Sequence, residues 1–211
     1  MTDPSPPARK RLRLVADRDA LAALSDEELM ERHRDGHEGC FDILVERYKT
    51  KMVNFIRRMG FPASRAEELA ADVFLKVHRA APRYQPTAKF TTFLYTVARR
   101  RGLNAKDRMS HRLEIAAGGH ELDMGPGPSI DVDRRLAAKR SVALLELELE
   151  RLPDGHRDAF ALYYGQGLSC AEIADVLSIS AAEVKGRLAY SRKLLRQRLA
   201  GHVPEATSSE T

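Results

Sequence analysis

Residues 168–199 read LSCAEIADVLSISAAEVKGRLAYSRKLLRQRL. Ser169 and Glu172 fit a capping box, in which the serine hydroxyl accepts a free backbone N–H and the carboxylate reaches back to the cap. Ser180 and Glu183 repeat this arrangement later in the stretch. The pattern therefore predicts two helices that begin close together and are separated by a tight turn at residues 178–180.

Apolar and basic residues divide these two helices into faces. The first has a short apolar stripe of Ile173, Ala174 and Leu177. The second has apolar residues at helical spacing, namely Val184, Leu188, Leu195 and Leu199. Its opposite face is basic, with Lys185, Arg187, Arg192, Lys193, Arg196 and Arg198. A short helix, a turn and a longer basic helix are typical of a helix-turn-helix with a recognition helix. The alternative is a helical hairpin whose basic face is merely solvated.

The composition is that of a globular chain with an anionic partner. The chain has 211 residues, of which 43% are hydrophobic and 31% charged, enough to bury the core of one domain or two small ones. The formal net charge of +5 favours nucleic acid or a membrane surface. No apolar run could span a bilayer, so we expect no stable membrane insertion. The two cysteines, Cys40 and Cys170, fit a reducing cytoplasm rather than a disulfide scaffold.

The chain predicts an all-α fold of two small helical domains joined by a flexible linker, the second a helix-turn-helix domain. Pro and Arg dominate the N-terminal end, and Gly and Pro interrupt the middle of the chain at 118–119 and 125–128. We expect a disordered basic tail at 1–19, a helical domain at 20–109, a linker at 110–131, the helix-turn-helix domain at 132–200 and a disordered tail at 201–211.

Four helices are predicted in the first domain. Ser25 and Glu28 fit a capping box, and Gly36 is a stop signal. The second helix has an apolar face of Phe41, Val45, Tyr48, Met52 and Ile56. Ser64 and Glu67 predict the cap of a third helix, with a buried face of Ala66, Leu69, Ala70, Val73 and Val77. Its other face places Leu75 among charges, and an exposed leucine of this kind can contact a partner.

A loop and a fourth helix follow, and both carry nucleic-acid signals. The loop at 82–89 has prolines on either side of Tyr84 and Gln85. The helix begins at Phe90, with Phe90, Leu94 and Val97 able to pack inward and Arg99, Arg100 and Arg108 able to face phosphates. Aromatic residues beside a basic run suit unpaired bases, which stack on rings. The alternative is that Phe93 and Tyr95 belong to the core.

Two stretches together resemble one family. Residues 65–77, RAEELAADVFLKV, and 89–95, KFTTFLY, resemble region two of bacterial sigma factors, and residues 152–199 resemble region four. The chain is similar to the extracytoplasmic-function class of the sigma-70 family, which lacks a middle domain. The resemblance implies a non-enzymatic protein without a cofactor, which binds core RNA polymerase, directs it to promoter DNA and is controlled by an anti-sigma factor.

The resemblance also implies three sets of site residues. Polymerase docking falls on Asp72, Leu75, Lys76 and Arg79. Capture and melting of the minus-ten element fall on Tyr84, Gln85, Lys89, Thr92, Tyr95, Arg99, Arg100 and Arg108. Reading of the minus-thirty-five element falls on Lys185, Gly186, Arg187, Ala189, Tyr190 and Arg192. The chain departs from the family pattern at several positions, so the resemblance implies the function but does not specify the promoter sequence. These positions are Phe93, Arg100, Ser178, Glu183, Gly186, Ala189 and Tyr190.

Two other functions are open at this stage. One is a helix-turn-helix regulator that does not touch polymerase, although the N-terminal half shows no sensor domain. The other is a zinc protein, because His33, His37 and Cys40 have ligand-like spacing. Gly36 and Gly39 interrupt any helix there, and no fourth ligand is evident. We therefore expect no metal site.

Overall fold

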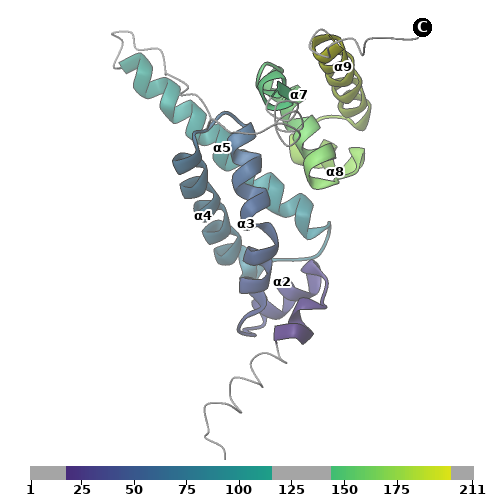
Figure 1. Cartoon of the computed structure of the whole chain (residues 1–211). Coiled ribbons are helices and arrows are strands. Elements are labelled where there is room, and N and C mark those ends of the chain that lie inside the picture. The colour runs from purple at the N-terminus through teal and green to yellow at the C-terminus, as the bar shows by residue number, and fades with distance from the viewer. Residues whose placement is uncertain (1–17, 116–143, 201–211) are drawn as a thin grey trace, which may run out of the picture. The chain divides into compact units, whose positions relative to one another are not determined.

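The computed structural model describes residues 18–115 and 144–200 (Figure 1). The predicted C-terminal tail, most of the predicted linker and residues 1–17 of the predicted N-terminal tail lie outside these ranges, whereas residues 18 and 19 of that tail are helical. Every regular element within them is a helix and none is a strand, which confirms the all-α class. The described chain divides into two compact units, one of residues 18–57 and 61–101 and the other of 58–60, 102–115 and 144–200.

The first unit is built on three long helices. It contains α2 (Asp26–Arg34), α3 (Cys40–Arg58), α4 (Ala63–Ala80), the 3₁₀ turn η1 (Ala81–Arg83) and the start of α5 (Phe90–Ile115). Aromatic pairs join α3 to α5, with ring centroids 5.1 Å apart for Phe55 and Tyr95 and 5.8 Å apart for Tyr48 and Phe90. All five residues predicted for the buried face of α4 are buried, and Phe74 is buried with them.

Of two helix starts predicted in this unit, one is confirmed and the other is wrong. The Ser25–Glu28 capping box is present, and α2 ends just before Gly36, which has a φ of +90°. The predicted cap of α4 at Ser64 and Glu67 is wrong. Helix α4 begins at Ala63 after an extended Pro62, so Ser64 lies inside the first turn. Proline supplies the chain break that the serine was expected to supply.

Helix α5 is longer than the sequence predicted, and its N-terminus is capped by a side chain from another helix. It continues to Ile115, so the first residues of the predicted linker are helical. The carboxylate of Glu27, on α2, accepts the backbone N–H of Phe90 at 2.6 Å. A carboxylate at this end also complements the helix dipole. This long-range contact fixes where the preceding loop ends.

The second unit contains the predicted helix-turn-helix. After the helical residues 144–150 come α7 (Asp154–Phe160), the π-helical η2 (Ala161–Gly165), α8 (Cys170–Leu177) and α9 (Ala181–Ala200). Helix α9 packs on both α7 and α8. Its predicted apolar residues Val184, Leu188 and Leu195 are buried, and Leu195 forms a small core with Leu149 and Leu152.

The turn between α8 and α9 uses a serine where the backbone favours glycine. The Ser169–Glu172 capping box of α8 is present, as predicted. Ser178 caps the C-terminus of α8 in the left-handed region, with a φ of 57°. The second predicted box is only half formed. Ser180 accepts the N–H of Glu183 at 3.1 Å, but the carboxylate of Glu183 accepts from Arg187 at 2.6 Å.

Candidate nucleic-acid interface

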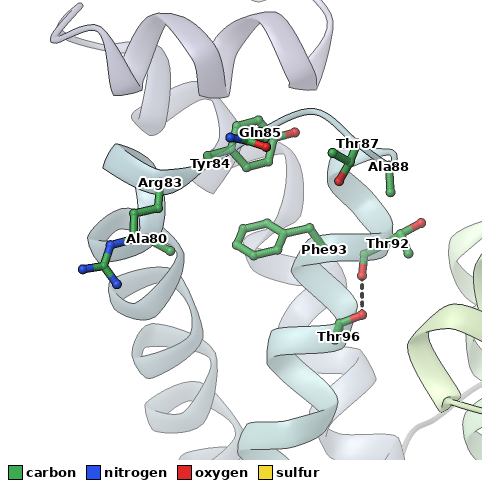
Figure 2. Close-up of a pocket in the computed structure, with 9 residues that line it drawn as sticks. All are labelled: Ala80, Arg83, Tyr84, Gln85, Thr87, Ala88, Thr92, Phe93 and Thr96. Atoms are coloured by element: carbon green, nitrogen blue, oxygen red, sulfur yellow. Dashed lines mark hydrogen bonds between the residues drawn. The ribbon is translucent and has the colours of Figure 1, made fainter.

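The loop after α4 and the first turns of α5 enclose a pocket of about 570 Å³ in the first unit. Figure 2 shows the ring of Phe93 pointing into the space between the end of α4 and the side chains of Thr92 and Thr96. The lining residues are Ala80, Arg83, Tyr84, Gln85, Thr87, Ala88, Thr92, Phe93 and Thr96. The pocket therefore combines an aromatic ring, an amide and several hydroxyls.

Tyr84 is held in the wall of this pocket by ring packing and by a hydrogen bond to its backbone. Its ring packs on Phe93 and Phe90, with centroid separations of 5.6 and 6.5 Å. Its carbonyl oxygen accepts a hydrogen bond from Arg34 at 3.4 Å. Burial, with the nearby carboxylate of Glu27, raises the pKa of Tyr84 to about 12. The hydroxyl is thus a neutral group that can both donate and accept.

Two of the residues that line the pocket, Tyr84 and Thr92, have a buried hydroxyl without a partner in the described part of the chain. Tyr84 and Thr92 are only 6% and 5% exposed, and neither hydroxyl oxygen has a hydrogen-bond partner among the described residues. The backbone carbonyl of Thr92, by contrast, accepts a hydrogen bond from the hydroxyl of Thr96 at 2.7 Å (Figure 2). A buried polar group without a partner costs about 1–3 kcal/mol. A polar ligand that displaced the atoms now covering either hydroxyl would supply the missing hydrogen bond.

Tyr95 requires a correction. The sequence placed it among the residues that contact the minus-ten element, yet its side chain is fully buried against Phe55. Burial also raises the pKa of Tyr95 above its ordinary value. A ring in this position supports the core and does not offer a face to a DNA base. Phe93 is the ring of α5 that faces the pocket (Figure 2).

The other predicted minus-ten residues lie around this pocket or farther along α5. Gln85 and Lys89 are exposed on the loop. Arg100 and Arg108 are exposed, and Arg99 is partly buried. The next arginine, Arg101, has a different task, because its guanidinium forms an ion pair with Asp72 of α4.

The exposed face of α4 contains the predicted docking residues. Leu75 is 51% exposed, as the sequence predicted, and Lys76 and Arg79 are exposed beside it. Asp72 is only partly exposed because Arg101 binds its carboxylate through Nη2 and, at 3.1 Å, through Nε. Asp72 therefore joins α4 to α5, in addition to any contact with a partner.

Most of the predicted recognition residues are exposed along α9 in the second unit. They are Lys185, Gly186, Ala189, Tyr190 and Arg192. Gly186 and Ala189 are small and allow a close approach of the helix backbone. Tyr190 is 49% exposed, and its ring lies 4.9 Å from that of His156 at the start of α7. Burial and Arg187 lower the pKa of His156, which favours its neutral form.

Arg187 differs from its neighbours on α9. Its guanidinium donates to the carbonyl of Gly155 at 3.1 Å and to Glu183 at 2.6 Å. Only 22% of its side chain is exposed. The sequence predicted a side chain directed into the DNA groove, whereas the structure directs it against α7.

Of the three residues considered for a zinc site, His33 contacts another histidine. His33 Nε2 lies 3.0 Å from Nδ1 of His78, and both rings pack on Phe41. Cys40 is buried and free. Across residues 18–115 and 144–200, no three His, Cys, Asp or Glu side chains gather as a metal site would require. None of the described helices combines the length and the apolarity needed to cross a bilayer.

Two stretches of the chain match known protein families. Residues 44–111 match Sigma-70 region 2, and residues 143–195 match Sigma-70, region 4. The sigma factor CarQ of Myxococcus xanthus is 31% identical over 166 residues, which cover 77% of this chain and 92% of CarQ. This chain belongs to the extracytoplasmic-function group of the sigma-70 family. It is a promoter-specific transcription initiation factor.

One further sigma factor and two solved structures are also similar to this chain. The RNA polymerase sigma-H factor of Pseudomonas aeruginosa is 27% identical over 192 residues, covering 88% of this chain and all of that protein. Among solved structures, CnrH in complex with the cytosolic domain of CnrY aligns with a TM-score of 0.61 at 23% identity, over 84% of this chain and 99% of CnrH. RpoE of Bartonella quintana, in complex with the anti-sigma factor NepR, aligns with a TM-score of 0.62 at 16% identity, over 76% and 96%. These structures share the fold.

Proposed function

We propose that this sigma factor captures one unpaired base of the minus-ten element in the pocket between the 84–88 loop and α5. The observation that carries the proposal is the pair of buried hydroxyls, on Tyr84 and Thr92, that have no partner among the described residues. An extruded base has an edge rich in donors and acceptors, which satisfies such groups. Capture of this base then holds the promoter open.

The other pocket residues fit the same ligand. Phe93 offers a ring on which a base can stack, a contact worth about 1–3 kcal/mol per base. Gln85, on the exposed loop, has an amide that can donate and accept at once. We assign phosphate contacts beyond the pocket to the exposed arginines Arg100 and Arg108. Lys89 and Arg99 attract the DNA strand toward the pocket by their positive charge.

We propose that α9 reads the minus-thirty-five element in the major groove. Lys185 and Arg192 supply positive charge, and Gly186 and Ala189 permit close approach. Tyr190, whose ring is steadied by His156, supplies an apolar surface of the kind that contacts a thymine methyl group. Arg187 holds α9 in place rather than reading a base.

We further propose that the α4 face around Leu75 binds core RNA polymerase. An exposed leucine among charged residues resembles the centre of a protein interface, where apolar anchors are surrounded by a polar rim. The fold neighbour RpoE was solved with the anti-sigma factor NepR, and CnrH with the cytosolic domain of CnrY. We infer that an anti-sigma factor likewise binds this chain, that the protein performs no chemistry of its own, and that it acts in the cytoplasm with polymerase.

The test of the pocket assignment uses holoenzyme, reconstituted from the full chain and core polymerase, and single-stranded minus-ten oligonucleotides. Tyr84→Phe and Thr92→Val each remove a hydroxyl with little change of shape. Because the free protein loses only an unsatisfied group, its stability should be unchanged or higher. Binding should weaken by about 1 kcal/mol, roughly fivefold, for the preferred base alone. Unchanged binding by both variants would remove the pocket from the mechanism.

A further inference from the structure

A second hollow, of about 550 Å³, adjoins the end of α4. Its lining consists of Lys76, Arg79, Ala80, Pro82 and Arg83. The three cations follow one another at roughly helical spacing from α4 into η1, so they gather on one side of this segment. All three are exposed. A concave surface with three positive charges attracts an anion.

Nothing within the described residues neutralises these cations. None of Lys76, Arg79 and Arg83 forms an ion pair or hydrogen bond with another described residue. The carboxylate of α4 nearest in sequence, Asp72, is already bound by Arg101. The charge is therefore available for a ligand, and phosphate oxygens are well suited to bind lysine and arginine donors.

The hollow and the base pocket share two residues. Ala80 and Arg83 line both. Figure 2 shows Arg83 at the edge of the base pocket, beside Ala80. A nucleotide whose base enters the pocket keeps its phosphates at that edge, since the sugar joins the two. The ligand that fits next to a captured base is thus the backbone of the same strand.

We propose that Lys76, Arg79 and Arg83 form a phosphate site that holds the DNA backbone beside the captured base. The inference rests on the base capture proposed above. It brings Arg83, which the sequence-based site did not include, into promoter binding. It also assigns Lys76 to DNA binding rather than to polymerase docking. Arg79 shares a helix face with Leu75 at a spacing of four residues and borders both surfaces.

The experiment measures binding of holoenzyme to a fluorescent single-stranded minus-ten oligonucleotide. One phosphate at a time is replaced by a neutral methylphosphonate. With the wild-type chain, the neutral linkage beside the captured base should weaken binding about tenfold. With the double variant Lys76→Ala, Arg83→Ala, the same substitution should change binding less than about twofold, because the partner charges are gone. Arg57→Ala, at an exposed position on α3, is the matched control and should retain the full effect.

Salt dependence gives a second readout. The slope of log affinity against log salt concentration should fall by about 0.7 for each lost phosphate contact on a single strand. All titrations are made with core polymerase in excess, so that every sigma factor is in holoenzyme. Since Lys76 and Arg83 are exposed, the double variant should fold normally, and circular dichroism checks this.

Two results would overturn the phosphate site. In one, the double variant keeps the same position-specific methylphosphonate effect as the wild type. In the other, it loses affinity for core polymerase but not for DNA, which would mean that the cations bind an acidic protein surface. Failure of base capture itself would look different. Wild-type holoenzyme would then bind an oligonucleotide with an abasic site at the captured position as tightly as the intact one.

Discussion

The guanidinium of Arg187 donates a hydrogen bond to the carbonyl oxygen of Gly155, 3.1 Å away, and so joins α9 to the first turn of α7. Glu183, one turn earlier on α9, accepts the other end of the guanidinium. The space is close-fitting, since a Cβ atom on Gly155 would lie 2.3 Å from Nη1 of Arg187. A glycine at position 155 thus permits the contact that fixes the orientation of the recognition helix.

Replacement of Arg187 should therefore affect stability and DNA binding in a particular way. Arg187→Ala should lower the free energy of unfolding by about 1–2 kcal/mol, because a charge-assisted hydrogen bond and an ion pair are lost. It should weaken binding to all minus-thirty-five sequences by a similar factor. Urea unfolding followed by circular dichroism and binding to a duplex library measure the two effects. Arg192→Ala, on the exposed face of α9, should leave stability within about 0.5 kcal/mol. Relaxed specificity at one base pair would instead make Arg187 a base reader.

Ser178 offers a stabilising substitution. Its left-handed conformation costs an L-residue about 1–2 kcal/mol, whereas glycine adopts it freely but loses more entropy on folding. Ser178→Gly should raise the free energy of unfolding by about 0.5–1 kcal/mol. Ser178→Ala keeps the Cβ atom and should give no gain. An equal gain from both would show that backbone strain at the turn is not the cause.

Acid should destabilise the protein through two partly buried histidines, His33 and His156. Burial and then His78 lower the pKa of His33 from 6.5, although Asp42 opposes them, and burial and Arg187 lower that of His156. A lowered pKa means that the unfolded chain binds more protons below pH 6.5, so the free energy of unfolding decreases as the pH falls through that value. His33→Phe should reduce this pH dependence, measured by urea unfolding between about pH 7.5 and 5.5. A steeper dependence in the variant would contradict the assignment.

Polymerase docking depends on Leu75 in this account. Leu75→Glu should leave the fold intact because the side chain is 51% exposed. It should weaken binding to core polymerase at least about tenfold, since an apolar anchor of about 1.5–3 kcal/mol is replaced by a charge. Arg57→Glu, exposed on α3, controls for the added negative charge. Equal affinity of the two variants in a competition assay would place the docking surface elsewhere.

Local patterns predicted the helices well where one residue pair decides a boundary. The boxes at Ser25–Glu28 and Ser169–Glu172 each lie within one turn, so their spacing determines the contact. The same spacing misled at Ser64, because Pro62 had already started α4. Spacing shows that a cap is possible but not which of two neighbouring starts is used.

The site was harder to predict because its contacts are long-range. Tyr95 and Phe93 are two residues apart in one aromatic run, and only packing against α3 and the loop decides which is core and which lines the pocket. The bond between Arg187 and Gly155 likewise joins different helices. No periodicity within one helix indicates such a partner. Arg83 was overlooked because a single arginine in a loop carries no pattern of its own.

The most direct test of base capture is permanganate footprinting of open complexes on a promoter library. Holoenzyme with the wild-type chain should melt only promoters that carry the preferred minus-ten base. Phe93→Ala and Gln85→Ala should melt these promoters poorly, because the stacking ring or the loop amide is missing from the pocket. Arg57→Ala should melt them as the wild type does. Melting that is indifferent both to the minus-ten sequence and to the pocket variants would contradict the account.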